Sequence, residues 1–378
     1  MYTLKHYDTP LIDFEITDDK LNGQSCRIVR LFEAESMLLP TGLTPTDEGL
    51  MSWLKSRVIP KNREFVENFL AKNGLSRKDT KGIIDACMGL SLNDVYWVVD
   101  SDFTGLFKDY NLFEHDFVKA LSLIAYTGYG SSRASGFTSS PEFTTAGMLR
   151  KGWRRLRGTI YLYKGGTSGA ANTGNEPYSE FMASQLADRM GIKHVDYDLA
   201  RWKGHVCSTC ELFTDINNSY VPMYRFVGSK ATLNQIADFL KSLGGEYYDA
   251  FADMMIFDAL IFNEDRHLGN YGLMVANDTN KPVCFAPLFD HGLSLFNYAM
   301  ADDWENISEY RKTRRTSNGA SFDDVAAEFM SARQKKMLRR LIGFKFDKHP
   351  SYNLPGKRIK AIEDFLQKRV DELLNINA

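Results

Sequence analysis

The sequence predicts an α+β protein in which a strand-rich part precedes a mostly helical part. Between residues 142 and 213, short apolar segments bounded by turn residues are typical of strands, and they surround one amphipathic helix. From residue 232 onward, apolar residues instead recur at helical spacing. A third part, residues 1–126, is expected to be a mostly helical accessory region ahead of these two.

The accessory region opens with a short strand-like stretch at residues 11–14 and continues with three predicted helices. The first helix begins at the cap sequence of residues 44–47 and ends near Pro60. The second surrounds Phe69, and the third follows a capping box at residues 76–79. No residue type or spacing in this region indicates catalytic chemistry.

Residues 127–228 are expected to form a small β-rich lobe. They open with a Gly/Ser-rich loop, and the dipeptide Arg157-Gly158 further on is typical of a hairpin turn. The expected elements, in chain order, are strands 142–155 and 159–164, a helix that starts at Asn175 and closes near Gly191, and strands 194–199 and 205–213.

Residues 229–378 are expected to form a larger, mostly helical lobe. One amphipathic helix covers residues 233–243 and ends at two glycines. The next, between Tyr248 and Phe262, is apolar on several sides, which predicts a buried, central helix. Two further helices are predicted, one after the capping box at residues 321–324 and one over residues 359–373.

Composition and charge argue against several classes of protein. Of 378 residues, 44% are apolar and 25% are charged, which is ordinary for a globular enzyme. The net charge of -2 gives no electrostatic reason to expect direct nucleic-acid binding. No apolar run approaches the roughly 20 residues that cross a bilayer, and the N-terminus lacks the apolar core of a signal peptide. We therefore expect a cytoplasmic protein, with translocation to a host cell left open.

The five cysteines are widely spaced and odd in number, which favours reduced thiols over a disulfide framework. Cys207 and Cys210 form a CxxC pair, but no second pair of cysteines or histidines accompanies them to complete a zinc site. We interpret both as structural cysteines in a strand.

The strongest functional signal is an ordered set of oxygen-bearing side chains. Asp265 is followed five residues later by Asn270, and a predicted strand–turn–strand then leads to Asp290. Phosphoryl transfer needs one carboxylate to orient the acceptor hydroxyl, and a second carboxylate with an amide oxygen to hold magnesium on the phosphates. The spacing predicts Asp265 as the catalytic residue and Asn270 and Asp290 as metal ligands. A single Asp/Asn pair would instead favour a plain turn.

A lysine and a glutamate extend this signal. Lys164 ends the apolar strand 160–163, where its ammonium group could reach nucleotide phosphates. Glu180 lies in the following helix, where a carboxylate could pair with that lysine. The structural alternatives are a solvated lysine at a strand end and a glutamate that complements the helix dipole. Taken with Asp265, the two residues predict a two-lobed, protein-kinase-like fold.

The loop that would cover the nucleotide has two candidates, because no GxGxxG motif occurs. We prefer residues 144–151, which contain Gly147 and Lys151, since they precede Lys164 closely and their backbone amides could face phosphates. The alternative is the glycine-rich stretch at residues 128–130 with Gly136, which we interpret more readily as a linker.

Three further features are assigned from position. The strand 205–213 ends where the hinge of a two-lobed kinase would bind adenine, so Glu211 and Phe213 are predicted there. His267 is interpreted as a structural residue because it stands two positions after Asp265 in a loop. The basic run within residues 310–317 is interpreted as a solvated surface loop, with a phosphorylation or docking site as the alternative.

Residues 262–270 and 286–295 together resemble the catalytic segments of HipA-like serine/threonine kinases, and the resemblance extends from Ser140 to the C-terminus. It implies ATP and Mg²⁺ as cofactors and a protein substrate with a Ser or Thr acceptor. It also implies that Asp265 is the catalytic base, that Asn270 and Asp290 bind the metal, and that Lys164 binds phosphate. An antitoxin-like inhibitor is left open as a partner.

Residues 146–151 resemble the glycine loop of that family, in which an autophosphorylated hydroxyl can eject the loop and inactivate the enzyme. The candidate hydroxyls in this chain are those of Ser139, Ser140, Thr144 and Thr145. The N-terminal region, in contrast, does not resemble the subdomain with which members of the family contact an antitoxin.

Two other functions remain open. The Asp-Arg-His pattern with a later Asp-x-Gly also resembles that of phosphoinositide lipid kinases, so a lipid or small-molecule acceptor is an alternative. No basic amphipathic helix for membrane docking is predicted, which disfavours the lipid. A non-catalytic binding module is the other alternative, and the joint presence of Asp265, Asn270, Asp290 and Lys164 argues against it.

Overall fold

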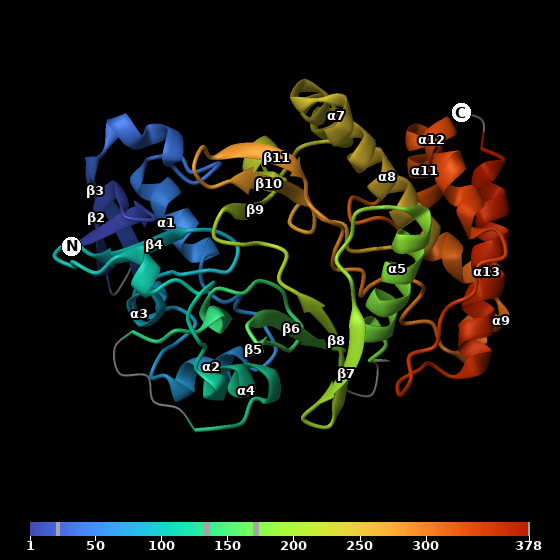
Figure 1. Ribbon diagram of the computed structural model, residues 1–378, viewed down its shortest axis with the longest axis horizontal. Coiled ribbons are helices and arrows are strands. Elements are labelled where there is room, and N and C mark those ends of the chain that lie inside the picture. The colour runs from blue at the N-terminus through green and yellow to red at the C-terminus, as the bar shows by residue number, and fades with distance from the viewer. Residues whose placement is uncertain (20–22, 132–136, 169–173, 377–378) are drawn as a thin grey trace. The chain divides into compact units, whose positions relative to one another are not determined.

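The computed structural model describes residues 1–19, 23–131, 137–168 and 174–376 (Figure 1). The chain divides into two compact units. The first unit comprises Met1–Lys164, Glu211–Val221 and Met274–Val283, and the second comprises Gly165–Cys210, Pro222–Leu273 and Cys284–Ala378. Helices and antiparallel sheets occur together, as the α+β prediction required. The predicted boundaries after residues 126 and 228 stay predictions.

The first unit opens with a sheet that the sequence predicted only in part. Its four strands lie in the order β3–β2–β1–β4, and all neighbouring pairs run antiparallel. The predicted strand at residues 11–14 lies inside the much longer β2, whose Leu11, Ile12 and Phe14 are fully buried. The bounds are β1 Tyr2–His6, β2 Thr9–Asp19, β3 Gly23–Leu31 and β4 Tyr96–Asp100.

Three predicted helices of the first unit are confirmed. Thr46 caps α1 by accepting a hydrogen bond from the Gly49 N–H group. The cap of α3 is Asp79, which accepts from Gly82, so the predicted capping box placed the helix correctly but chose the wrong first residue. A fourth helix, α4, was not predicted. The bounds are α1 Asp47–Ser56, α2 Val66–Lys72, α3 Thr80–Cys87 and α4 Lys119–Thr127.

The predicted hairpin turn is confirmed, because β5 (Lys151–Leu156) and β6 (Thr159–Gly165) pair across Arg157 and Gly158. Both turn residues have positive φ, +51° and +90°, as a two-residue hairpin turn requires. The first strand was expected from residue 142 but begins at Lys151. Residues 144–150 therefore form a loop ahead of β5, and not an arm of the hairpin.

A three-stranded sheet, in the order β11–β10–β9, belongs mainly to the first unit. The predicted hairpin around residues 277–280 is confirmed by β10 (Gly272–Ala276) and β11 (Lys281–Phe285). Its third strand, β9 (Asn218–Pro222), was not predicted. Gly136, part of the alternative glycine-rich loop, lies outside the described residues.

The second unit is built on helices that the sequence predicted well. The predicted helix after Asn175 is α5 (Glu176–Met190), and it ends at Gly191 with a left-handed φ of +77°. The hairpin after it, β7 (Asp198–Trp202) and β8 (His205–Glu211), starts four residues later than the predicted strand 194–199.

Helix α8 (Gly245–Ile261) is the centre of the second unit, since every residue from Phe251 to Ile261 is buried. Figure 1 shows α11, α12 and α13 together on one side of α8, and all three contact it. This confirms the prediction of a buried, central helix. The other helices of this part are α6 Tyr224–Val227, α7 Leu233–Leu243, α9 Ala301–Glu305, α10 Ile307–Tyr310, α11 Phe322–Phe329, α12 Ala332–Leu338 and α13 Gly356–Leu374.

Within the described ranges, no helix has both the length and the apolar character needed to cross a membrane.

Candidate active site

The loop that carries Asp265 leaves α8 through a tight backbone turn. Phe262 ends the helix with a left-handed φ of +54°, and its side chain packs among Phe296, Phe322 and Phe365. The next residue, Asn263, folds back on the helix: its N–H group and its side-chain amide both donate to Asp258. The loop therefore starts from a fixed point on a buried helix.

Arg266 organises the rest of the loop. Its Nε and Nη2 atoms donate to the Asp258 carboxylate at 2.8 and 3.1 Å, and both side chains are 5% exposed. Its Nη1 atom donates to the carbonyl oxygens of Asn270 and Phe289, at 2.7 and 2.8 Å. Because one nitrogen binds both carbonyls, the end of the Asp265 loop and the residue before Asp290 lie side by side.

Asp265 and Asn270 are joined directly. The Asn270 side-chain nitrogen donates to the Asp265 carbonyl oxygen at 2.9 Å, which fixes the orientation of the amide. Asp265 itself is half-buried, whereas Asn270 is 7% exposed. The catalytic role of Asp265 and the metal-binding role of Asn270 stay predictions.

Asp290 stands at a special backbone position, with φ at +58°. Its N–H group donates to the Tyr197 hydroxyl at 3.1 Å. Burial raises the pKa of Tyr197 well above its usual value, and the negative charges of Glu180, Cys210 and Asp290 add to the rise. Two residues earlier, Leu288 donates to the Lys193 carbonyl and accepts from the Val195 N–H group, so an isolated parallel β-bridge holds the approach to Asp290.

Glu264, beside Asp265, is half-buried and forms an ion pair with Arg314 at 3.6 Å. Burial raises the pKa of Glu264, and Arg314 opposes that rise. This pair connects the basic run of residues 310–317 to the Asp265 loop, so the run is not a wholly free surface loop.

Glu180 is fully buried in α5, where it accepts a hydrogen bond from the Ser208 hydroxyl. Lys164, in the first unit, is 7% exposed and faces Lys151 across the β5–β6 hairpin. This burial argues against the structural alternative, a solvated lysine at the strand end. Its pairing with Glu180 stays a prediction.

In the preferred nucleotide loop, Gly147 has a φ of +93°, a backbone conformation that glycine adopts more readily than other residues. The Lys151 ammonium group donates to the Ala146 carbonyl at 2.9 Å and so closes the loop on itself. At the predicted hinge, Glu211 accepts from the Tyr161 hydroxyl at 2.9 Å, and the Phe213 ring packs edge-on against Tyr220.

The candidate phosphoacceptor hydroxyls differ in their surroundings. Ser140 is 1% exposed and donates to the Glu142 carboxylate. Thr144 is 8% exposed and donates to the Leu90 carbonyl. Thr145 is half-buried, and its hydroxyl donates to the Pro141 carbonyl and accepts from the Trp153 indole. Ser139 is also half-buried.

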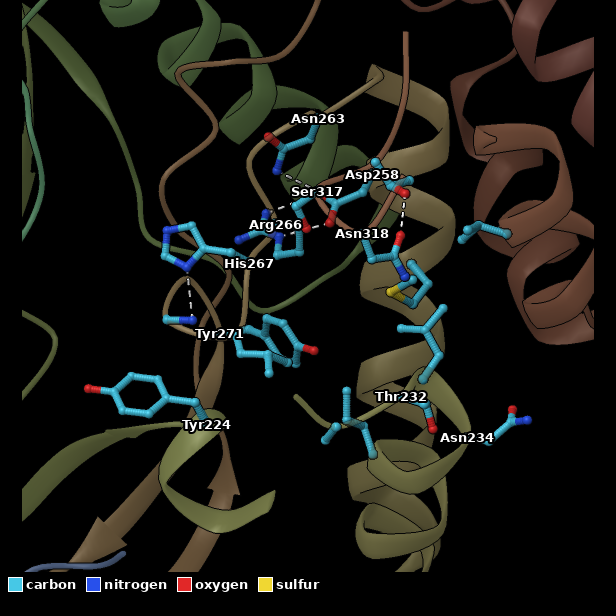
Figure 2. Close-up of a pocket in the computed structure, with 18 of the residues that line it drawn as sticks. Tyr224, Thr232, Asn234, Asp258, Asn263, Arg266, His267, Tyr271, Ser317 and Asn318 are labelled. Atoms are coloured by element: carbon cyan, nitrogen blue, oxygen red, sulfur yellow. Dashed lines mark hydrogen bonds and ion pairs between the residues drawn. The ribbon is translucent and has the colours of Figure 1, made fainter. Parts of the chain in front are cut away.

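A cavity of about 790 Å³ opens in the second unit beside the Asp265 loop (Figure 2). Its walls come from α6 to α8, from Arg266–Gly269, from residues 316–318 and from α11. Asp258, Asn263 and Arg266 gather at one end of it, and Thr232 and Asn234 lie at the other. Asp265, Asn270 and Asp290 do not line it, so the cavity adjoins the predicted catalytic residues without containing them.

The predicted metal ligands suit magnesium by their chemistry. Asp290 offers carboxylate oxygens and Asn270 an amide oxygen, which are the hard donors that Mg²⁺ prefers. Within the described residues, no group of three or more His, Cys, Asp or Glu side chains could hold a metal by itself. Such a sparse donor set fits an ion whose other ligands are phosphate oxygens and water. That Cys207 and Cys210 are structural cysteines stays a prediction.

The sequence analysis missed Asp258, Arg266 and Tyr197, which position the predicted residues. Asp258 carried a signal, because it is the one charged residue in the stretch 254–261 and a buried carboxylate needs a cation beside it. Arg266 is the first arginine after it. Tyr197 carried none, since its role depends on a contact with a residue 93 positions away.

The chain is similar to a known protein family and to known proteins. The sequence pattern of the HipA-like C-terminal domain family matches residues 144–344, which include Lys164, Asp265, Asn270 and Asp290. The serine/threonine-protein kinase CtkA of Helicobacter pylori strain J99 is 28% identical over 146 residues, which cover 34% of this chain and 43% of that protein. The chain thus matches less than half the length of this relative.

Two solved structures are similar. The crystal structure of the H. pylori proinflammatory kinase CtkA matches with a TM-score of 0.48 and 19% identity, over 63% of this chain and 91% of that one. HipA of Shewanella oneidensis MR-1, solved with HipB and operator DNA, matches over 100% of both chains, with a TM-score of 0.51 and 13% identity. The second likeness confirms the α+β fold expected from the resemblance. The match of the family pattern to more than half of the sequence shows that the chain belongs to the HipA-like C-terminal domain family.

Proposed function

We propose that the chain is an ATP- and Mg²⁺-dependent serine/threonine protein kinase. The observation that carries the proposal is the bridge made by Arg266, whose Nη1 atom binds the carbonyls of Asn270 and Phe289. Through it, one buried guanidinium sets the backbone on which Asp265, Asn270 and Asp290 stand. Phosphoryl transfer depends on such placement more than on reactive side chains.

In the proposed reaction, the oxygen of a Ser or Thr hydroxyl attacks the γ-phosphorus of ATP. The bond between that phosphorus and the β–γ bridging oxygen breaks, and ADP leaves. Asp265 orients the hydroxyl and accepts its proton, while Asn270 and Asp290 would hold Mg²⁺ on the phosphates, where the ion neutralises the developing charge. Lys164 and the amides of residues 144–150 are proposed to bind nucleotide phosphates.

Two partners follow from the family. A polypeptide with a Ser or Thr acceptor is the proposed substrate, and the chain itself is a further acceptor at residues 139–145. The Shewanella HipA structure contains HipB, and we propose that this chain likewise has an antitoxin-like protein inhibitor.

The test is phosphate transfer from γ-labelled ATP with Mg²⁺. Purified wild type is compared with Asp265→Ala and Asp290→Asn, with a generic Ser/Thr protein and phosphoinositide vesicles as alternative acceptors. We expect label on protein with wild type and a loss of about 10²-fold or more with either variant. Label on lipid alone would replace the protein-kinase proposal with a lipid kinase. Wild type no more active than the variants would overturn the proposal of an enzyme.

Autophosphorylation is checked on the same samples by mass spectrometry. We expect a phosphate within residues 139–145, and Thr145 is favoured over Ser140 because the Ser140 hydroxyl faces a buried carboxylate. A wild-type protein that labels other substrates and carries no phosphate in this stretch would remove the autophosphorylation proposal alone.

A further inference from the structure

Residues 59–64 of the N-terminal region contact the candidate nucleotide loop along its length. The Ile59 N–H group donates to the Phe143 carbonyl at 2.7 Å, and the Glu64 N–H group donates to the Met148 carbonyl at 2.8 Å. Between them, the Arg63 Nη1 atom donates to the Thr145 carbonyl at 2.9 Å. All of these residues lie in the first unit.

The far end of the loop is fastened by an ion pair. The Glu64 carboxylate accepts from Arg150 three times, from its backbone N–H group at 3.2 Å, from Nε at 3.3 Å and from Nη2 at 2.8 Å. The Arg150 side chain is 7% exposed and that of Glu64 24%, and the guanidinium also stacks on the Phe65 ring. An ion pair that is shielded from water and joined by several hydrogen bonds stabilises the fold more than an exposed ion pair does.

These contacts engage carbonyl oxygens of the loop. With the Lys151 bond to Ala146, the carbonyls of Thr145, Ala146 and Met148 are all taken. In a trans peptide the carbonyl and the following N–H group point in opposite directions. The N–H groups of Ala146, Gly147 and Leu149 therefore point away from the donors that hold those carbonyls. Among the described residues, no acceptor binds these three N–H groups.

We infer that residues 59–64 are a clamp that holds the loop carbonyls so that its free N–H groups face the phosphate oxygens of a nucleotide, with Glu64 and Arg63 as positioning residues. Successive free N–H groups in a bent backbone form an anion-binding concavity. Without the clamp, the carbonyls would be free to rotate toward the phosphates and repel them. The inference rests on the proposed function, and it gives the N-terminal region a role in nucleotide affinity.

The variants remove the contact between Glu64 and Arg150 and leave the neighbouring side chains unchanged. Glu64→Ala abolishes the ion pair, whereas Glu64→Gln keeps an acceptor oxygen for Arg150. The matched control is Asp94→Asn, because Asp94 forms a similarly shielded bidentate pair with Arg57, at 2.7 and 2.8 Å, that does not touch the loop. Two readouts are taken on the full chain: the KM and kcat for ATP, and hydrogen exchange without nucleotide of peptides covering residues 59–64, whose amides donate to the loop carbonyls.

We expect Glu64→Ala to raise the KM for ATP about tenfold, with kcat changed less, because the defect is in loop placement. Exchange of the amides of residues 59 and 64 should quicken, because their acceptors lie in or beside the loop. Glu64→Gln should recover most of the affinity for ATP. Asp94→Asn should leave the KM for ATP within about twofold of wild type, even if Asp94→Asn and Glu64→Ala lower Tm to the same extent. A KM for Glu64→Ala equal to that of Asp94→Asn would overturn the inference, as would a fall in kcat alone.

The exchange measurement separates this inference from the proposed function. If wild type neither binds ATP nor transfers phosphate, the kinase proposal fails. If Glu64→Ala leaves the exchange protection of the amides of residues 59 and 64 unchanged, residue 64 does not fasten the loop, and the clamp is overturned whatever the activity.

Discussion

The Arg266 guanidinium holds the Asp258 carboxylate with two nitrogens, at 2.8 and 3.1 Å, at a site where both side chains are 5% exposed. The pair joins the buried helix α8 to the loop that carries Asp265. Asn263 donates to the same carboxylate, so two side chains, one of them charged, satisfy the buried Asp258 carboxylate.

Replacing Asp258 with Asn should strongly destabilise the protein. The substitution leaves the Arg266 charge buried without its partner, and such losses cost about 3–5 kcal/mol. Urea unfolding measures the change, with Asp364→Asn as the control, because Asp364 pairs with Lys360 on an exposed helix face. Equal effects of the two substitutions would contradict the role given to Asp258.

Replacing Asn270 with Ala should weaken metal binding more than nucleotide binding. The variant loses the amide oxygen proposed to bind Mg²⁺ and the hydrogen bond that orients it on the Asp265 carbonyl. We expect the Mg²⁺ concentration for half-maximal activity to rise about tenfold or more. A magnesium titration of phosphate transfer checks this, and an unchanged requirement would remove Asn270 from the proposed ligands.

Replacing Gly147 with Ala should lower nucleotide affinity. A Cβ atom there would collide with the Lys151 ammonium group, and the φ of +93° is unfavourable for any side chain. Gly158→Ala is the matched control, because Gly158 has a φ of +90° but open space around it. Both variants should lose stability, by about 1 kcal/mol from the backbone alone, and only Gly147→Ala should raise the KM for ATP. An equal KM in both would contradict the role of the loop.

The first unit should lose stability in mild acid through His6. This side chain is 3% exposed and packs between the Tyr7 and Tyr96 rings, and burial lowers its pKa to about 4, against a smaller opposing effect of Asp94. Because the unfolded chain binds the proton near pH 6.5, stability should fall as the pH drops from about 6.5 to about 4, by roughly 3 kcal/mol.

The measurement is denaturant unfolding followed across that pH range. His6→Phe keeps a ring in the same place and removes the titrating group, so its stability should vary less with pH over this interval. A wild type and a variant with the same pH dependence would show that another group is responsible.

The sequence predicted those parts whose signals are local. Helix α8 is apolar on several sides, α11 has a serine cap that the structure retains, and the β5–β6 turn carries a glycine at one of its two positive-φ positions, so each could be found from neighbouring residues. The N-terminal sheet was mostly missed, because β3 places charged residues such as Arg27 and Arg30 on its outer positions and lacks a continuous apolar run.

The residues of the candidate site also fall into those that a local pattern predicted and those that it did not. Asp265 and Asn270 lie in one short segment, and their spacing and the position of Asp290 after them could be recognised from the sequence alone. Tyr197, Arg63 and Glu64 could not be found, since each acts on a segment more than 80 positions away in the chain. Residues that hold a site in place depend on tertiary contacts, which leave no periodic trace in the sequence.

The left-handed backbone at Asp290 limits which amino acids can replace it. Among residues with a side chain, Asn and Asp tolerate this conformation best, and a β-branched or bulky residue would distort the turn. An Asp290→Asn protein should therefore keep the geometry of the site with only its charge removed, whereas Asp290→Val would confuse lost chemistry with a displaced backbone. For capturing a bound acceptor in an inactive complex, asparagine is the substitution to make.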